Sequence, residues 1–151
     1  MNAKRGRPGS SGQGRPSRQV EAPAVVSRPW LWYRTAPGAR SPAEEEFLSL
    51  PAVGQAGLGA VITRYRLGQT RSGDVLPVAD GILELRHRHD TLRFRVLFIP
   101  WGRACVGLTA FCKKERTTPK PDLDRAKARA KRWRAANGAE PAPLDDSAGN
   151  K

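Results

Sequence analysis

Residues 81–114 constrain the fold most, because apolar and polar residues alternate through three consecutive runs of this segment. The runs lie at 82–86, 92–99 and 104–113, with Asp90-Thr91 and Pro100-Trp101-Gly102 between them. A period of two is typical of strands with two different faces, and short turns connect antiparallel neighbours. The segment therefore predicts a three-stranded antiparallel meander with one apolar face and one mixed face.

An aromatic run and two helical patterns precede this meander. Residues 30–33 predict a first strand. Ser41, followed by Pro42 and by a glutamate three residues on, is typical of a helix start, so we expect helices at 42–50 and 51–67. One apolar face is predicted for the second helix, formed by Val53, Leu58, Val61, Ile62 and Tyr65.

Two further segments complete the predicted fold. Residues 69–80 predict a polar loop. A last helix is expected after Pro121, ending at Asn137-Gly138, with cations opposite an apolar face. The residues of that apolar face are Leu123, Ala126, Ala130 and Trp133.

Positive charge and composition divide the chain into three parts. The formal net charge of the 151 residues is +13, which favours nucleic acid, the ribosome or an anionic surface as partner. Residues 1–28 are basic and rich in Gly, Pro and Ser, so we expect a disordered tail, and a second one at 138–151. Residues 29–137 have enough apolar residues to fold as one domain.

Cysteine spacing and hydropathy predict the cellular setting. Cys105 and Cys112 fall in one predicted strand, too far apart for a disulfide, so we expect reduced thiols. No apolar run approaches the length of a membrane span or of a secretory signal. We therefore expect a soluble, cytoplasmic protein with no membrane contact.

The mixed face of the meander is the candidate site. Alternation places Glu84 and Arg86 together, Arg93 and Arg95 beside them, and three residues of the last strand on the same side: Thr109, Phe111 and Lys113. Cations contact phosphates and an exposed aromatic ring stacks on a base, which suits single-stranded RNA. Arginines on a solvated sheet face and an edge lysine that blocks aggregation are the alternative interpretation.

Blocks of this sequence resemble a known toxin family. The segments WYRTAPGARSPAEEEFLSLP, GILELR, FRVLF and LTAFCKKERTTP occur in order and with the family's spacing between Trp32 and Trp133. Together they resemble the phage-derived, HigB-like branch of the RelE/ParE-type toxins. The resemblance implies an α+β fold: an antiparallel sheet of about four strands packed on two N-terminal helices, with a C-terminal helix.

The same resemblance implies a function and site residues. It implies the toxin of a type II toxin–antitoxin pair, a ribosome-dependent endoribonuclease that cleaves mRNA in the ribosomal A site and is neutralised by a helix-turn-helix antitoxin. The matching positions are Arg86, Arg95, Phe111 and the pair Lys113-Lys114. We predict catalytic roles for Arg86, Arg95 and Lys113, through charge stabilisation. RNA contacts are predicted for Arg93, Phe111 and Lys114, and no metal or cofactor is expected.

The proton-transfer groups are left open by the sequence. His87 and His89 near the first turn are candidates because a histidine titrates near neutral pH, but a polar, solvated turn is the favoured interpretation. Glu84 shares the face of Arg86 and is a third candidate, or a simple ion-pair partner. Two other functions also fit: a ParE-like gyrase inhibitor with the same fold, and an RNA-binding module that does not cut.

Overall fold

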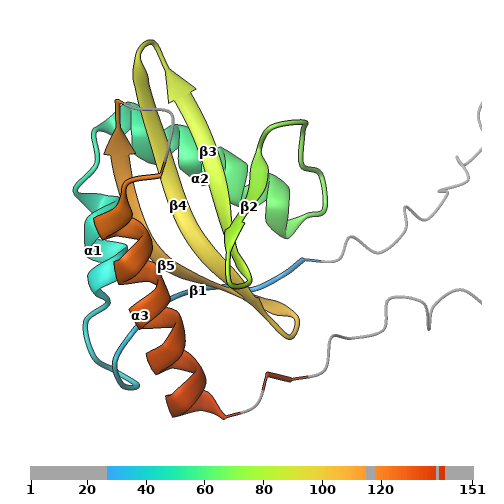
Figure 1. Ribbon diagram of the computed structural model, residues 1–151. Coiled ribbons are helices and arrows are strands. Elements are labelled where there is room, and N and C mark those ends of the chain that lie inside the picture. Colours follow the sequence, from blue (N-terminus) through green and yellow to red (C-terminus); the bar gives the residue numbers. More distant parts are fainter. Residues whose placement is uncertain (1–26, 115–117, 139, 142–151) are drawn as a thin grey trace, which may run out of the picture.

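A five-stranded sheet with helices on both faces forms the structure (Figure 1). The computed structural model describes residues 27–114, 118–138 and 140–141. The predicted α+β class is confirmed; the tails expected at 1–28 and 138–151 lie almost entirely outside the described residues. In chain order the elements are β1 (Trp30–Trp32), α1 (Pro42–Leu48), α2 (Ala52–Arg66), β2 (Val75–Ala79), β3 (Ile82–His89), β4 (Leu92–Trp101), β5 (Ala104–Lys113) and α3 (Lys120–Asn137).

The sheet contains the predicted meander and two further pairings. Its strand order is β1-β5-β4-β3-β2. Strands β3, β4 and β5 pair antiparallel as predicted, whereas β1 lies parallel to β5 and makes the sheet mixed. The predicted loop at 69–80 is wrong in part, because β2 pairs antiparallel with β3 there. Pro77 and an adjacent register shift interrupt the alternation that would otherwise mark this edge strand.

Helix α2 packs on one face of the sheet, behind it in Figure 1. Its buried side chains are Leu58, Val61 and Ile62, which belong to one core cluster with Phe94 of β4. The predicted apolar face is confirmed for these three residues. Val53, which we placed on that face, is 41% exposed, and its neighbour Gly54 lies against the ring of Phe94 instead. Any side chain in place of Gly54 would collide with the Phe94 ring.

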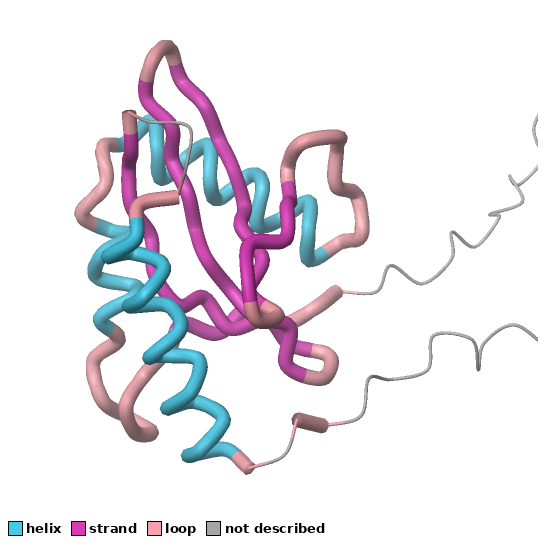
Figure 2. Tube along the Cα trace, viewed as in Figure 1, coloured by secondary structure: helices cyan, strands magenta, loops and turns pink. Residues whose placement is uncertain are grey.

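Helices α3 and α1 pack at the other face and beside β5 (Figure 2). The predicted face of α3 is confirmed: Ala126 and Ala130 are buried, and Leu123 and Trp133 pack against the same core cluster. Glu46 of α1 joins three elements, because it accepts hydrogen bonds from Thr109 of β5 at 2.7 Å and from Arg129 of α3 at 2.8 Å. Figure 2 shows the tip of the β3–β4 hairpin extending beyond the first turn of α3.

Both cysteines lie in β5 as predicted. They are free thiols, Cys105 buried and Cys112 exposed. Burial raises the pKa of the Cys105 thiol to about 11, so this group is protonated at neutral pH. In the described part of the chain, no helix has the length and apolar character needed to cross a membrane.

Candidate nucleic-acid interface

Strand register places the predicted cations side by side at one end of the sheet. Arg86 lies opposite Arg95, which in turn lies opposite Phe111, and Arg93 lies opposite both Arg88 and Lys113. All of these side chains share the face on which α3 packs, because cross-strand partners point to the same side. We call Arg86, Arg88, Arg93 and Arg95 the arginine face.

Glu84 is the centre of this cluster and its side chain is 5% exposed. Its Oε1 atom lies 3.2 Å from the Nε atoms of both Arg86 and Arg95, and its Oε2 atom accepts a hydrogen bond of 2.6 Å from the Thr118 hydroxyl. One carboxylate thus holds two guanidinium groups and fastens the segment before α3. Because its oxygens are occupied in this way, Glu84 is better placed to position the arginines than to accept a proton.

Arg95 and Lys113 are buried cations, 3% and 5% exposed. Burial lowers the pKa of Arg95, with Glu84 opposing the shift, and the Arg95 Nη1 atom donates to the Phe94 carbonyl at 2.9 Å. Burial also lowers the pKa of Lys113, which Glu84 raises and the neighbouring arginines lower further. Buried cations crowded in this way favour an anion that enters among them.

A hollow of about 290 Å³ opens on the arginine face, lined by Gly73 and the four arginines. Two of these side chains are fixed by backbone acceptors: Arg93 donates to the Lys114 carbonyl at 2.7 Å and Arg88 to the Asp90 carbonyl at 3.0 Å. Arg88 was not among the predicted site residues. Its position two residues after Arg86 was the available signal, since alternation returns it to the same face.

The loop that brings Gly73 to the hollow is fastened by the next residue. Asp74 forms a bidentate ion pair with Arg64 of α2, at 2.8 and 2.9 Å, and accepts a hydrogen bond from the backbone of Arg71 at 2.9 Å. The Asp74 carbonyl accepts from the backbone of Arg86 at 2.9 Å. The hydrogen bond from Arg64 is the main reason that the pKa of Asp74 is lowered.

We predict that Asp74→Asn lowers the free energy of unfolding by about 2 kcal/mol at neutral pH, because it removes a charge-assisted bidentate pair. A carboxyl whose pKa is lowered by folding adds stability above its ordinary pKa of 3.8 and loses it as the pH falls further. Urea unfolding of both proteins should show the difference closing below that pH. Asp80→Asn, at a carboxylate that is 70% exposed, is the control and should change little.

Both histidines lie on the opposite face of the sheet. His87 stacks on the ring of Phe94 at 6.3 Å and packs against Gly57 of α2, and His89 is half exposed near Asp90. Burial lowers the pKa of His87, which favours the neutral ring. Each histidine is next in sequence to an arginine of the arginine face, and neighbouring residues of a strand point to opposite faces of the sheet. Neither imidazole ring is therefore placed to act as acid or base on an anion held by the arginine face.

One of the predicted RNA-binding residues differs from expectation. The ring of Phe111, expected to be exposed for stacking, is buried in the core that α3 covers, with 9% of the residue exposed. Alternation identifies its face but not the helix that packs there. Lys114 is exposed directly after β5, where its carbonyl holds Arg93.

Metal-binding residues are not gathered at this interface. Among the residues that the structure describes, no group of three or more His, Cys, Asp or Glu side chains could hold a metal ion. The cationic face and the hollow instead match the negative charge of phosphate groups.

Fold and site together define a small α+β protein with a cationic sheet face suited to a polyanion. Residues 45–131 match the model of the family described as "Phage derived protein Gp49-like (DUF891)". The chain is also 38% identical, over 112 residues, to the "Probable endoribonuclease HigB1" of Mycobacterium tuberculosis, in strains CDC 1551 / Oshkosh and ATCC 25618 / H37Rv. That alignment covers 74% of this chain and 90% of the relative.

The chain therefore belongs to this phage-derived, HigB-like toxin family, as its sequence blocks predicted. The region that matches the family model contains the whole arginine face, Glu84 and Lys113.

Proposed function

We propose that this protein is an endoribonuclease toxin that cuts mRNA at the arginine face. The observation that carries the proposal is the Arg86–Glu84–Arg95 cluster, in which Glu84 and Arg95 are buried and which opens on a hollow lined by cations. The M. tuberculosis relatives are named as probable endoribonucleases, which supports the same activity. Residues 29–137 would form the toxin domain.

The proposed reaction needs no cofactor. The 2′-hydroxyl of the RNA gives its proton to water and attacks the adjacent phosphorus in line, the bond to the following 5′-oxygen breaks, and a 2′,3′-cyclic phosphate and a 5′-hydroxyl result. Negative charge builds on the phosphoryl oxygens in the transition state. Arg86 and Arg95, held by Glu84, would stabilise that charge without reorganisation, which is a large contribution in buried sites.

Lys113 is our candidate for proton transfer to the leaving 5′-oxygen. It is the amine of the cluster, and burial lowers its pKa towards the range in which a lysine exchanges protons near neutral pH. With both histidines on the other face, we propose that the ribosomal A site aligns the 2′-hydroxyl. Activity on free RNA should accordingly be low.

The arginine face extends beyond the scissile phosphate. Arg88 and Arg93 lie opposite each other, two residues along the strands from Arg86 and Arg95. Two strand residues span about 7 Å, so the outer pair could contact a neighbouring phosphate of the same RNA strand. The inner pair would then act in chemistry and the outer pair in binding.

We predict that Arg88→Ala weakens RNA binding about tenfold, because it removes one charge-assisted contact to phosphate, and that cleavage at saturating RNA changes little. Binding measured at several salt concentrations should show a reduced salt slope. Arg103→Ala, at an exposed arginine in the β4–β5 turn, is the matched control. Equal losses for both variants would mean that bulk charge, not the hollow, binds RNA.

The decisive test is induced expression of the wild type with mapping of mRNA 5′ ends, with and without the adjacent gene. New 5′-hydroxyl ends within codons, suppressed by the adjacent gene product, would support both the nuclease and a cognate antitoxin. We propose an antitoxin of the helix-turn-helix type.

Two other outcomes of that experiment would support different functions. Intact mRNA together with tight RNA binding would support a non-catalytic RNA-binding module. That alternative is favoured by the position of both histidines away from the cluster. Intact mRNA with inhibited supercoiling would support a ParE-like gyrase inhibitor.

A further inference from the structure

A hydroxyl group just before α3 reaches the buried carboxylate of the arginine face. The Thr118 hydroxyl donates a hydrogen bond of 2.6 Å to the Oε2 atom of Glu84. The other oxygen of Glu84, Oε1, lies 3.2 Å from the Nε atoms of Arg86 and Arg95. Both arginines come from the sheet, whereas Thr118 comes from a segment 34 residues away in sequence. The two oxygens of this carboxylate are therefore held by different parts of the fold.

Helix capping does not account for the hydroxyl of Thr118. Threonine is common at helix starts because its side-chain oxygen accepts a hydrogen bond from an amide of the first turn. The N-cap of α3 is Pro119, however, which makes no side-chain hydrogen bond, and Thr118 precedes it. The Thr118 hydroxyl donates to Glu84 instead, so this contact serves the arginine face and not the end of the helix.

Two prolines restrict the backbone that carries Thr118. Pro119 has φ −60° and ψ 137°, and Pro121 lies in the first turn of α3. A proline fixes its own φ and also favours an extended backbone for the residue before it. Thr118 itself is partly buried. The hydroxyl is thus presented to Glu84 from a backbone with little freedom to turn away.

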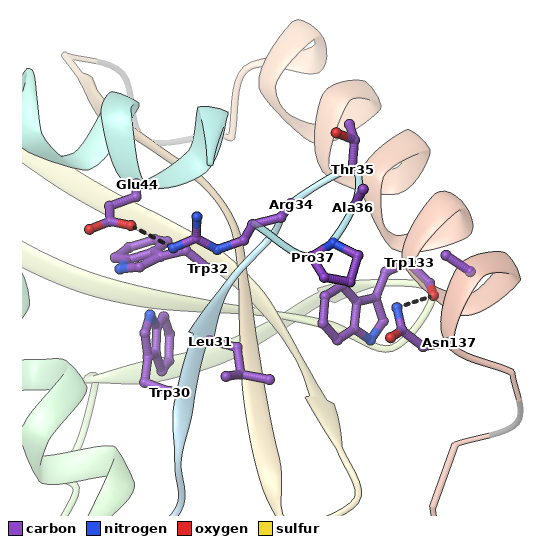
Figure 3. A pocket seen from close by; sticks show the side chains of 11 residues that line it. Trp30, Leu31, Trp32, Arg34, Thr35, Ala36, Pro37, Glu44, Trp133 and Asn137 are labelled. Carbon is purple, nitrogen blue, oxygen red and sulfur yellow. Dashed lines mark hydrogen bonds and ion pairs between the residues drawn. The ribbon is translucent and has the colours of Figure 1, made fainter. Parts of the chain in front are cut away.

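Helix α3 is fixed to the sheet independently of Thr118. Arg129 donates to both carboxylate oxygens of Glu46 in α1, at 2.8 and 2.9 Å. Near the other end of α3, Trp133 faces the loop after β1, where both line a pocket of about 500 Å³ (Figure 3). Loss of one hydroxyl hydrogen bond would therefore leave α3 in place, and its effect would fall on Glu84.

The hydroxyl determines how the charge of Glu84 is shared. A buried acceptor that loses its donor seeks another one, because an unpaired polar group is costly away from water. Without Thr118, Oε2 would compete with Oε1 for the two arginines and draw their guanidinium groups away from the hollow. The less compensated carboxylate would also attract Lys113 more strongly, and Glu84 already raises the pKa of that lysine.

We propose that Thr118 is a positioning residue of the nuclease, whose hydroxyl holds Glu84 in the orientation that aims its two arginines at the scissile phosphate. The inference rests on the proposed function, because it gives the hydroxyl a role in RNA cleavage. Thr118 acts through Glu84 and does not touch the reacting atoms. RNA binding by the outer pair, Arg88 and Arg93, should not depend on it.

The test compares Thr118→Val and Thr118→Ser with the wild type, using the full chain and mRNA on ribosomes. Valine keeps the shape and removes the hydroxyl, so kcat should fall about tenfold while KM stays unchanged. Serine keeps the hydroxyl and should restore most of kcat. Thr109→Val is the matched control. The Thr109 hydroxyl donates to Glu46 at 2.7 Å, away from the hollow, so its loss should lower the unfolding midpoint but not kcat.

The pH dependence is a readout that a purely structural contact would not change. In Thr118→Val the stronger attraction of Glu84 should raise the pKa of Lys113, which an NMR titration of the lysine side chain measures. An acid that must be protonated to act loses activity as the pH rises through its pKa. The basic limb of the kcat profile should therefore move to higher pH in Thr118→Val and stay in place in Thr109→Val.

Three results would overturn the inference: wild-type kcat in Thr118→Val, no rescue by Thr118→Ser, or an equal loss of kcat in Thr109→Val. A wild-type chain that leaves ribosome-bound mRNA intact would instead reject the proposed function. In that case the titration of Lys113 decides on Thr118 alone. A raised pKa of Lys113 in Thr118→Val would support the hold on Glu84, and an unchanged pKa would contradict it.

Discussion

Arg95→Ala should abolish growth arrest on induced expression and reduce mRNA cleavage by a factor of about 100 to 1000, the usual loss when one preorganised charge donor is removed. Arg95 is 3% exposed and fixed by Glu84 and by the Phe94 carbonyl, so its guanidinium is held in one position before the RNA binds. Toxicity in cells and the abundance of new mRNA 5′ ends are the two measurements.

Two controls separate lost chemistry from lost folding. Arg95→Lys keeps the charge but loses the planar fork, and should recover only part of the activity. Arg103→Ala changes an exposed arginine and should remain fully toxic. If Arg95→Ala has the wild-type unfolding midpoint and still arrests growth, Arg95 takes no part in the mechanism.

Glu84→Gln should have the largest effect on stability, a loss of about 3 kcal/mol in the free energy of unfolding. Removing one partner of a buried ion pair leaves its counterpart charged and unpaired, and here two arginines and Lys113 would remain together. Urea denaturation measures the change. Added sulfate should restore part of the lost stability, because an anion bound among these cations can replace the carboxylate.

The matched control for this variant is Glu45→Gln. Glu45 pairs with Arg40 at 2.7 Å, but these side chains are 50% and 90% exposed, and such pairs contribute little. An equal loss in both variants would show that Glu84 is not the centre of a buried network. Glu84→Gln should also lower the pKa of Lys113 further, since Glu84 raises it in the native protein.

Local pattern predicted the part of the fold that depends on neighbouring residues. The period of two at 81–114 predicts the meander, and the same parity places Glu84, Arg86 and Arg95 on one face, where the register puts them. Parity also excludes His87 from that face, because it is one residue away from Arg86. Strict alternation along β3 is therefore sufficient to separate the arginines of the cluster from both histidines.

Long-range pairing could not be predicted in the same way. The parallel pairing of β1 with β5 joins two segments that are far apart in sequence. β2 pairs with its neighbour β3, but Pro77 and a register shift interrupt it, so neither β1 nor β2 has enough alternation to reveal its partner. The burial of Phe111 follows from where α3 packs. The hollow also depends on the position of the loop before β2. The ion pair between Asp74 and Arg64, which are ten residues apart in sequence, holds this loop in place.

The arginine face places function in opposition to stability. Arg86, Arg88, Arg93 and Arg95 line one hollow, and Glu84 is the buried carboxylate that balances them. Their mutual repulsion is present whenever the protein is folded and empty, and a bound polyanion relieves it. Such a chain resists unfolding and proteolysis best while it holds its substrate, so the supply of RNA in the cell would itself set how long the protein lasts.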